Sequence, residues 1–210
     1  MKLTTYFRST AAYRVRIALN LKGVEHQLIP LNLFAGEQKS AGFLNTNPDG
    51  LIPVLDTGVD ILTQSMAILE YLEETQSEVK LLPDDPLDRA FVRALAQTIV
   101  SDIHPLNNLR VLQYLAKQMG VNEAQKLQWY QHWVAVGFSG LEKRLAKSAG
   151  TFCVGDKLSI ADVCLIPQVY NANRFDCPMD DYPTLNRLNA ACLKLDAFAS
   201  AAPDLQPDAT

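Results

Sequence analysis

The sequence changes character at Leu82-Pro83-Asp84-Asp85-Pro86, a short acidic stretch that contains two prolines. Before it, segments rich in β-branched and aromatic residues alternate with helical patterns. Beyond it, strand signals disappear and apolar residues recur every three or four positions. A chain of 210 residues has room for two small domains. The sequence therefore predicts an α/β domain at residues 1–81, followed by an all-helical domain at residues 87–210.

Strands and helices are expected to alternate in the first part. The expected strands cover residues 3–7, 24–30, 52–56 and 59–62. The first two enclose a helix that ends near Gly23, which implies a parallel pair. The last two are joined by Thr57-Gly58, which implies a hairpin. A weak helix near residues 38–44 and a longer one from Gln64-Ser65 complete this part.

Helical patterns fill the second part. Residues 87–118 predict one long helix, which Pro105 should bend because its ring removes a backbone donor. Residues 123–147 predict another, with Trp129, Trp133, Val136 and Leu141 facing inward. Ser159 and Asp162 resemble a capping box before a helix at residues 161–172. Further helices are expected from Pro183 and at residues 193–201, and the Pro/Asp tail after Ala202 is expected to be loose.

The start of the first helix carries Arg8, Ser9 and Thr10. Ser9 and Thr10 are natural N-cap residues, and Val15, Ala18 and Leu19 follow at helical spacing. A helix N-terminus offers unpaired N–H groups and partial positive charge, so it favours an anion. These residues therefore suit a phosphate, a carboxylate or a thiolate, but a capped structural helix with an exposed arginine explains them equally well.

Two further segments are expected at the same side of the sheet. A cis bond at Ile52-Pro53 would turn the Ile52 backbone toward a ligand. Gln64-Ser65 begins a helix directly after a strand, so its N–H groups and the Ser65 hydroxyl should face the side on which Ser9 lies. By itself this is an ordinary cap. Together with Ser9 and the proline loop it indicates a ligand site at the strand ends.

The predicted long helix is unusually polar just past Pro105. One face of it would carry His104, Asn107, Asn108 and Val111. A lone histidine is often structural, but the polarity here favours a binding role. Arg110 lies six positions after His104, about 120° away on an ideal helix. It would reach the same ligand only through the bend or its own length. Arg174, by contrast, has a surface salt bridge as its default explanation.

Composition excludes several classes of function. The net charge is −4 and no Lys/Arg run occurs, so neither nucleic acid nor an acidic membrane surface is an expected partner. The four cysteines show no CxxC spacing, which fits a reducing cytoplasm. All four lie in the last third of the chain, so no nucleophile is near the first helix, which argues against a thiol–disulfide oxidoreductase. The three histidines are scattered without metal-ligand spacing, so no metal site is expected.

The chain resembles zeta-class glutathione transferases over nearly its whole length. This group includes maleylacetoacetate isomerase and bacterial maleylpyruvate isomerase. The segments that carry the resemblance are Arg8–Ala18, Asn47-Pro48, Ile52–Leu55, Gln64–Ile68, His104–Asn108, Val154–Asp156 and Ala161-Asp162. The resemblance implies a thioredoxin-like N-terminal domain, a helical C-terminal domain and a homodimer.

The resemblance also implies how glutathione is bound. The family motif Ser-Ser-Cys-Ser-Trp-Arg-Val-Arg-Ile is matched with Ser9 and Thr10 at the two serines and Ala11 at the cysteine. Ser9 or Thr10, at the helix N-terminus, would lower the thiol pKa of glutathione. The other residues implied to bind glutathione are Gln38, Ile52 through its backbone, Gln64 and Ser65 at the γ-glutamyl carboxylate, His104 and Asn108.

The implied reaction is the cis–trans isomerisation of maleylacetoacetate in tyrosine catabolism. The glutathione thiolate adds to the double bond, rotation follows, and elimination returns the trans product with glutathione unchanged. Arg8, Arg110 and Arg174 would bind the carboxylates and the developing enolate of this dianionic keto acid. Arg110 matches maleylpyruvate-type members better, so that substrate stays open. The same residues are also compatible with a transferase or dehalogenase acting on α-halo acids. A non-catalytic binding module is a third alternative, against which the retention of Arg8, Ser9 and Gln64-Ser65 argues.

Overall fold

Four short strands form the sheet of the N-terminal part, in the order β2-β1-β3-β4. Their bounds are β1 Lys2–Thr5, β2 Gln27–Pro30, β3 Val54–Asp56 and β4 Ile61–Thr63. β1 pairs with β2 in parallel, and β3 forms antiparallel pairs with β1 and β4. Leu3 lies opposite both Leu28 and Leu55, and Leu3 and Leu55 are completely buried. The predicted parallel pair and hairpin are confirmed.

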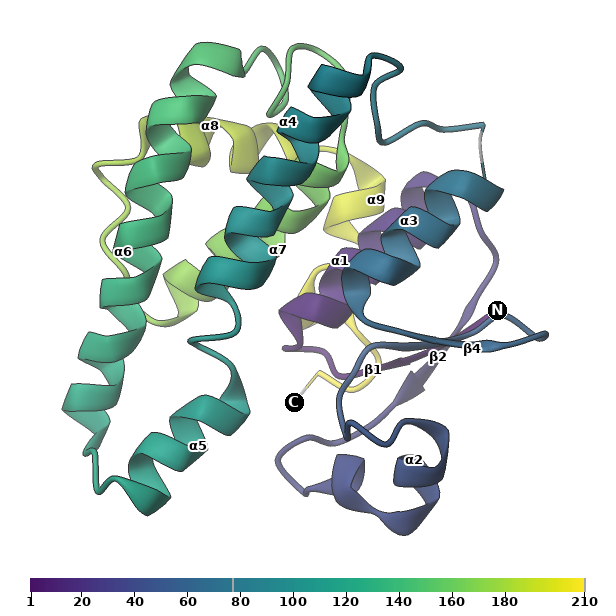
Figure 1. Ribbon diagram of the computed structural model, residues 1–210, viewed down its shortest axis with the longest axis vertical. Coiled ribbons are helices and arrows are strands. Elements are labelled where there is room, and N and C mark those ends of the chain that lie inside the picture. The colour runs from purple at the N-terminus through teal and green to yellow at the C-terminus, as the bar shows by residue number, and fades with distance from the viewer. Residues whose placement is uncertain (77, 210) are drawn as a thin grey trace. The chain divides into compact units, whose positions relative to one another are not determined.

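Two helices pack together on this sheet. They are α1 (Thr10–Leu21) and α3 (Ser65–Thr75), which Figure 1 shows side by side above the strands. The end of α1 is a Schellman motif, with Gly23 at φ +62° and the Val24 N–H donating to the Leu19 carbonyl at 2.9 Å. A 3-10 turn (Glu37–Lys39) and α2 (Ala41–Thr46) follow β2, close to the expected weak helix.

The computed structural model describes residues 1–76 and 78–209, which form two compact units. The first unit is Met1–Lys80 with Leu193–Thr210, and the second is Leu81–Cys192. The α/β plus all-helical architecture predicted from the sequence is confirmed. Ser77 and Thr210, which the predicted domains include, lie outside the described residues.

The C-terminal segment is not loose, so that prediction is wrong. It contains α9 (Asp196–Ala199) and a 3-10 turn (Pro203–Leu205), and α9 packs against α1. The Asp208 carboxylate accepts the Phe7 N–H at 2.9 Å, and buried Gln206 donates to the carbonyls of Ser200 and Ala202. Proline and aspartate do not prevent docking here, because local bonds from Gln206 and the long-range bond between Asp208 and Phe7 hold the segment in place.

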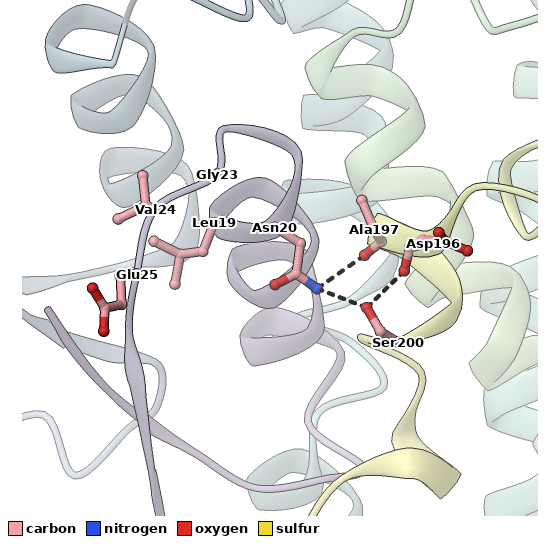
Figure 2. Close-up of a pocket in the computed structure, with 8 residues that line it drawn as sticks. All are labelled: Leu19, Asn20, Gly23, Val24, Glu25, Asp196, Ala197 and Ser200. Atoms are coloured by element: carbon pink, nitrogen blue, oxygen red, sulfur yellow. Dashed lines mark hydrogen bonds between the residues drawn. The ribbon is translucent and has the colours of Figure 1, made fainter.

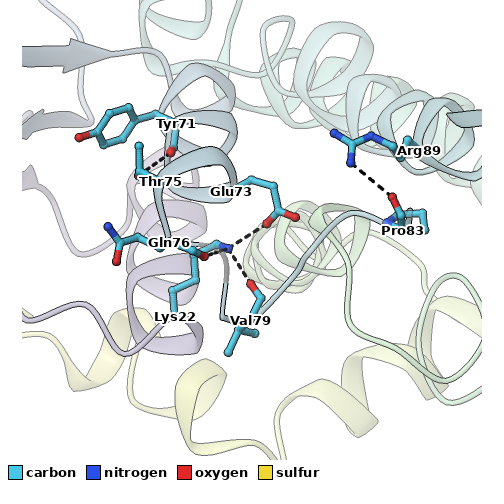
Figure 3. Close-up of polar contacts among 8 residues, drawn as sticks. All are labelled: Lys22, Tyr71, Glu73, Thr75, Gln76, Val79, Pro83 and Arg89. Carbon is cyan, nitrogen blue, oxygen red and sulfur yellow. Dashed lines mark hydrogen bonds and ion pairs between the residues drawn. The ribbon is translucent and has the colours of Figure 1, made fainter. Parts of the chain in front are cut away.

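Lys22 binds the segment that follows α3, at the end of the first part of the first unit. Its fully buried ammonium lies 2.8 Å from the Glu73 carboxylate and donates to the carbonyls of Gln76 (2.9 Å) and Val79 (2.6 Å), as Figure 3 shows. The three donors of an ammonium are thereby all used. The same view includes, within the second unit, the bond from Arg89 to the Pro83 carbonyl.

The second unit is entirely helical apart from two isolated bridges. Its helices are α4 Pro86–Gln97, α5 Leu109–Gln118, α6 Glu123–Ser148, α7 Ile160–Arg174 and α8 Pro183–Cys192, with a π-helical segment at Thr98–Ile103. α7 packs against α4 and α8, and it begins with the predicted capping box: Asp162 accepts the Ser159 N–H at 2.9 Å.

The single helix expected at residues 87–118 is wrong. After α4 the backbone widens into a π-helix, seen in the bond from the His104 N–H to the Ile99 carbonyl, and then leaves helical structure until α5. Asn108 begins α5 by accepting the Arg110 N–H. Pro105 therefore interrupts the helix rather than bending it, since its backbone nitrogen carries no hydrogen and cannot donate a helical hydrogen bond.

The buried face of α6 also differs from the prediction. Its buried residues are Tyr130, Val134, Phe138, Leu141 and Leu145. Only Leu141 was expected; Val136 is exposed, and Trp129 and Trp133 are half-buried. Both the predicted set and the buried set of apolar residues recur at three- to five-residue spacing, and packing against other helices selects one of them.

Candidate functional site

Four chain segments meet at one edge of the sheet. Because β1 and β2 are parallel and each next strand reverses, the ends of β1, β2 and β4 lie beside the start of β3. α1 begins just after β1, the 3-10 turn follows β2, cis Ile52-Pro53 precedes β3, and α3 begins after β4. The predicted cis bond is confirmed, and so is the expectation that Ser9 and Ser65 lie toward the same edge.

Ser9 is the N-cap of α1. Its hydroxyl oxygen accepts the Ala12 N–H at 3.2 Å, while its carbonyl accepts the Tyr13 N–H at 2.8 Å. An oxygen that accepts from the backbone directs its own hydrogen elsewhere, so Ser9 can donate to an anion in front of the helix. Thr10 is the first residue within α1 and is only 2% exposed. Of the two hydroxyls, Ser9 is therefore the accessible one.

Arg8 lies between the end of β1 and the cap of α1. Its guanidinium sits 4.7 Å from the centre of the Phe7 ring, within the range of a cation–π contact. The Phe7 ring is buried and its N–H is held by Asp208. Arg8 therefore has a fixed base next to Ser9, while its own side chain stays half-exposed.

The loop before β3 is braced by a buried asparagine. The Asn47 side-chain amide donates to the Leu51 carbonyl at 2.7 Å, and its oxygen accepts the Asp49 N–H at 3.2 Å. Gly50, at φ +62°, completes the turn. Within the part of the chain that the structure describes, the Ile52 backbone takes no part in this network. Its polar groups are thus available to a ligand.

Gln38 presents an unsatisfied polar atom at the same edge. It lies in the 3-10 turn after β2, and the residue is 9% exposed. Its Oε1 atom is buried and accepts no hydrogen bond from any residue that the structure describes. A buried acceptor without a donor is costly, so an N–H group of a ligand would stabilise it.

α3 begins with an unusual backbone. Gln64 has φ +66°, a left-handed conformation that costs a non-glycine residue of order 1–3 kcal/mol and is concentrated at functional sites. Buried Ser65 follows as the first helical residue, and its hydroxyl oxygen accepts from the Arg14 Nη1 at 3.2 Å. Arg14 was not predicted from the sequence, because a helical pattern does not show which arginine is buried.

The remaining predicted residues lie in the second unit. His104 and Asn108 belong to the turn between the π-helix and α5, Arg110 is an exposed residue of α5, and Arg174 ends α7. The expected shared face of His104, Asn107, Asn108 and Val111 is wrong, since residues 104–108 are not helical. The surface salt bridge considered for Arg174 gives way to a cation–π contact, 4.8 Å from the Phe175 ring.

One turn of α6 holds both arginine-bearing segments. The Trp129 indole donates to the Leu106 carbonyl at 2.9 Å, and the Asn107 amide donates to the Tyr130 carbonyl at 3.2 Å. The Tyr130 ring stacks on Phe175 at 3.8 Å. These contacts fix the turn before Arg110 and the corner after Arg174 to the same stretch of helix.

The adjacent Gln131 completes this arrangement. Its side-chain amide donates to the carbonyls of Phe175 (3.1 Å) and Asp176 (2.9 Å). Burial raises the pKa of Tyr130 well above its usual range, so the phenol stays neutral. The supporting role of Trp129 to Gln131 was missed from the sequence, where Trp129 is expected only as a core residue.

The cysteines and the possible metal ligands among the described residues do not form a reactive site. The four cysteines are all buried thiols. Burial raises the pKa of Cys177 to about 11, with the Asp176 carboxylate adding to the shift. Among the described residues no cluster of histidine, cysteine and acidic side chains could hold a metal ion. The described helices also include none long and apolar enough to span a bilayer.

A hollow of about 510 Å³ lies at the opposite end of α1, away from Ser9. Figure 2 shows Asn20 spanning it with bonds to the Ala197 carbonyl and the Ser200 hydroxyl, both at 3.1 Å. Glu25 and Asp196 also line it. Since a 12-residue helix is about 18 Å long, this hollow is separate from the polar groups at the sheet edge.

Comparison with known proteins accounts for both units. Residues 8–75 match the N-terminal domain of glutathione S-transferases, and residues 106–199 match the C-terminal domain. The chain belongs to the glutathione S-transferase family. The chain is 53% identical over 206 residues to a probable maleylacetoacetate isomerase of Vibrio cholerae, covering 97% of the chain and 96% of that relative. It is 47% identical over 208 residues to the rat maleylacetoacetate isomerase, covering 98% and 94%.

Solved structures give the class. The chain superposes with a TM-score of 0.98, at 44% identity and complete coverage of both chains, on a holo maleylpyruvate isomerase described as a bacterial zeta-class glutathione S-transferase. It superposes with a TM-score of 0.97, at 43% identity and complete coverage of both, on a maleylacetoacetate isomerase of Methylobacterium extorquens that holds malonate and glutathione. The predicted zeta-class membership and the thioredoxin-like plus helical fold are confirmed.

Proposed function

We propose that the chain is a glutathione-dependent isomerase that converts maleylacetoacetate to fumarylacetoacetate in the catabolism of aromatic amino acids. The observation that carries this proposal is full-length similarity to maleylacetoacetate isomerases, one of which was solved with glutathione and a dicarboxylate together. A cis-configured keto diacid has the same two-carboxylate character as malonate.

Glutathione fits the polar groups at the sheet edge. The Ile52 backbone suits the cysteinyl peptide group, and the orphaned Oε1 of Gln38 suits an N–H of the tripeptide. Gln64 and Ser65, at the start of α3, suit the γ-glutamyl carboxylate, because a helix N-terminus favours an anion. Residues 1–81 are accordingly proposed to supply most of the contacts to glutathione, and residues 87–210 most of the contacts to the substrate.

Ser9 is proposed to activate the thiol. Glutathione supplies a thiolate nucleophile that adds reversibly to the double bond. The Ser9 hydroxyl donates to this sulfur, and the partial positive charge at the N-terminus of α1 lowers the thiol pKa by stabilising negative charge. Thr10 is buried beneath the cap, which makes it a supporting residue rather than the donor.

Three arginines are proposed to bind the diacid. Arg8 stands beside the thiolate position, so it suits the carboxylate or the developing enolate nearest the attacked carbon. Arg110 and Arg174 are exposed cations whose segments are tied to one turn of α6, which suits the second carboxylate. His104 and Asn108 are proposed to contact glutathione; because Asn108 already caps α5 with its oxygen, its amide N–H group is what it can offer.

A turnover assay tests the reaction and the substrate together. With saturating glutathione, maleylacetoacetate should isomerise while the concentration of free thiol stays constant. Consumption of one thiol per turnover would instead identify a conjugating transferase or a dehalogenase. Absence of turnover combined with failure to bind glutathione-agarose would identify a non-catalytic module.

Maleylpyruvate isomerisation is the second candidate. It is favoured by the TM-score of 0.98 with a maleylpyruvate isomerase. A kcat/KM for maleylpyruvate at least tenfold above that for maleylacetoacetate would establish it as the substrate; the reverse ratio is expected.

The protein is further proposed to be a cytoplasmic homodimer. The hairpin tip Val59 is 97% exposed and Ile61 lies on β4, an edge strand. In the second unit, Leu87 and Val136 are exposed apolar side chains. Burying such residues against a second copy would stabilise a dimer. Light scattering during gel filtration should give twice the mass of the 23.3 kDa chain.

A further inference from the structure

α1 buries two arginines that serve different parts of the first unit. Arg14 and Arg16 are each 1% exposed. Residues two apart on a helix point about 200° away from each other, so the two guanidiniums meet different neighbours. Burying a guanidinium is costly unless its donors are used, which makes the partners informative.

The hydrogen bonds of Arg16 stabilise the fold of the first unit. Its guanidinium donates to the Ala201 carbonyl (3.0 Å), the Thr5 hydroxyl (2.9 Å) and the Phe7 carbonyl (3.1 Å). These bonds join the end of β1 to the C-terminal segment. None of them involves a group proposed to touch a ligand.

Arg14 points toward the other helix of the sheet. Its Nη1 donates to the Ser65 hydroxyl oxygen at 3.2 Å, in a fully buried contact. A hydroxyl has one hydrogen, and an arginine can only donate. With Arg14 behind it, Ser65 must therefore accept on that side and keep its own hydrogen for a partner elsewhere.

We propose that Arg14 is a positioning residue for glutathione: it orients the Ser65 hydroxyl as a donor to the γ-glutamyl carboxylate and places a buried cation behind that anion. This rests on the proposed function, since it assigns Ser65 to the same carboxylate. The N-terminus of α3 lies at the same position, and its partial positive charge favours an anion. The guanidinium thus adds charge and orientation to a helix N-terminus that alone would bind an anion weakly.

The contribution of Arg14 can be measured by binding, without turnover. The probes are glutathione and 4-aminobutanoyl-cysteinylglycine, which differs only in lacking the γ-glutamyl α-carboxylate. Calorimetric titration of wild type, Arg14→Met, Arg14→Lys and Ser65→Ala with both probes gives the affinity and its dependence on that carboxylate. Arg16→Lys is the matched control, because it alters an equally buried arginine of the same helix.

Wild type should bind glutathione at least tenfold more tightly than the analogue. Arg14→Met should weaken glutathione binding about 10- to 100-fold, as expected for a hydrogen bond to a charged group, and leave binding of the analogue within twofold. Ser65→Ala should remove the same preference. Arg14→Lys should recover part of it, because the charge remains while the planar fork is lost. Arg16→Lys should lower the melting temperature and keep the preference.

Three results would overturn this inference. Equal loss of affinity for both probes in Arg14→Lys, at a melting temperature matched to Arg16→Lys, would show a general structural role. An unchanged preference in the Arg14 variants would show that the hydroxyl is oriented without them. Failure of wild type to bind glutathione would overturn the proposed function itself, and the inference with it.

Discussion

The hydroxyl oxygen of Ser9 accepts the backbone N–H of Ala12 at 3.2 Å, so the residue proposed to donate to the glutathione thiolate is also the cap of α1. The capping bond also prepares Ser9 for its proposed role. Capping fixes the oxygen in space, and the same bond turns the hydroxyl hydrogen outward. A substitution of Ser9 should therefore lower both the stability of the protein and the rate of the reaction.

We expect Ser9→Ala to lower kcat/KM for isomerisation by roughly 10²-fold, the scale of losing one stabilising donor. The lost cap should also reduce the free energy of unfolding by about 1 kcal/mol. Asp85→Ala, which removes the cap of α4, controls for the stability effect and should leave the rate unchanged. An unaltered rate in Ser9→Ala, with a loss in Thr10→Val, would assign the role to Thr10.

Removing Gln131 should weaken binding of the diacid and spare glutathione. Its amide holds the carbonyls of Phe175 and Asp176, next to Arg174. We expect Gln131→Ala to raise KM for the diacid by up to about 30-fold, because two hydrogen bonds worth about 1 kcal/mol each position that corner. Steady-state kinetics with each substrate varied in turn measures both constants. Gln128→Ala, at an exposed position of α6, is the control; a matching rise in KM for glutathione would contradict the prediction.

Lys22→Met should destabilise the protein strongly. The substitution leaves the nearly buried Glu73 carboxylate and two carbonyls without their ammonium partner, which costs about 3–5 kcal/mol for a buried pair. Lys126→Met breaks the exposed pair with Glu123 and should cost less than about 1 kcal/mol. Urea denaturation measures both. Similar losses in the two variants would show that burial of Lys22 does not govern its contribution.

Two glycines of α6 should respond oppositely to alanine. A methyl group at Gly137 would overlap the buried side chain of Ile103 in the π-helical segment, so Gly137→Ala should cost about 1–3 kcal/mol. Gly140 has open space around it, so Gly140→Ala should stabilise the protein by about 0.5–1 kcal/mol through helix propensity. Thermal unfolding distinguishes the two, and stabilisation by Gly137→Ala would refute the packing argument.

Thiol reagents should not inactivate the enzyme near neutral pH. The family cysteine is replaced by Ala11, and the cysteines of the chain are buried. Since the thiolate is the nucleophile, raising the pKa of Cys177 to about 11 lowers its reactive fraction, and alkylation should accelerate about tenfold per pH unit below that value. Mass spectrometry after iodoacetamide treatment at pH 7.5 and pH 9 measures this. Rapid labelling at pH 7.5 would contradict it.

Much of the fold follows from local signals. The parallel pair, the hairpin, the caps at Ser9 and Ser159 and the stop at Gly23 each depend on a few neighbouring residues. The polar groups at the sheet edge were predictable for the same reason. Strand order and direction bring Ser9, Ile52 and Ser65 to one edge whatever the packing of the rest.

By itself, the sequence determined the order of strands and helices in the first part, the family and the residue types available for binding. Tertiary structure alone decided that Arg14 meets Ser65 while Arg16 meets Ala201, that residues 104–108 leave the helix, and that the C-terminal segment docks on α1. The physical reason is distance along the chain. Caps and turns form between residues close in the sequence, whereas buried Arg16 bonds to Ala201, which lies 185 residues away. The spacing of residues in the sequence does not predict such a contact.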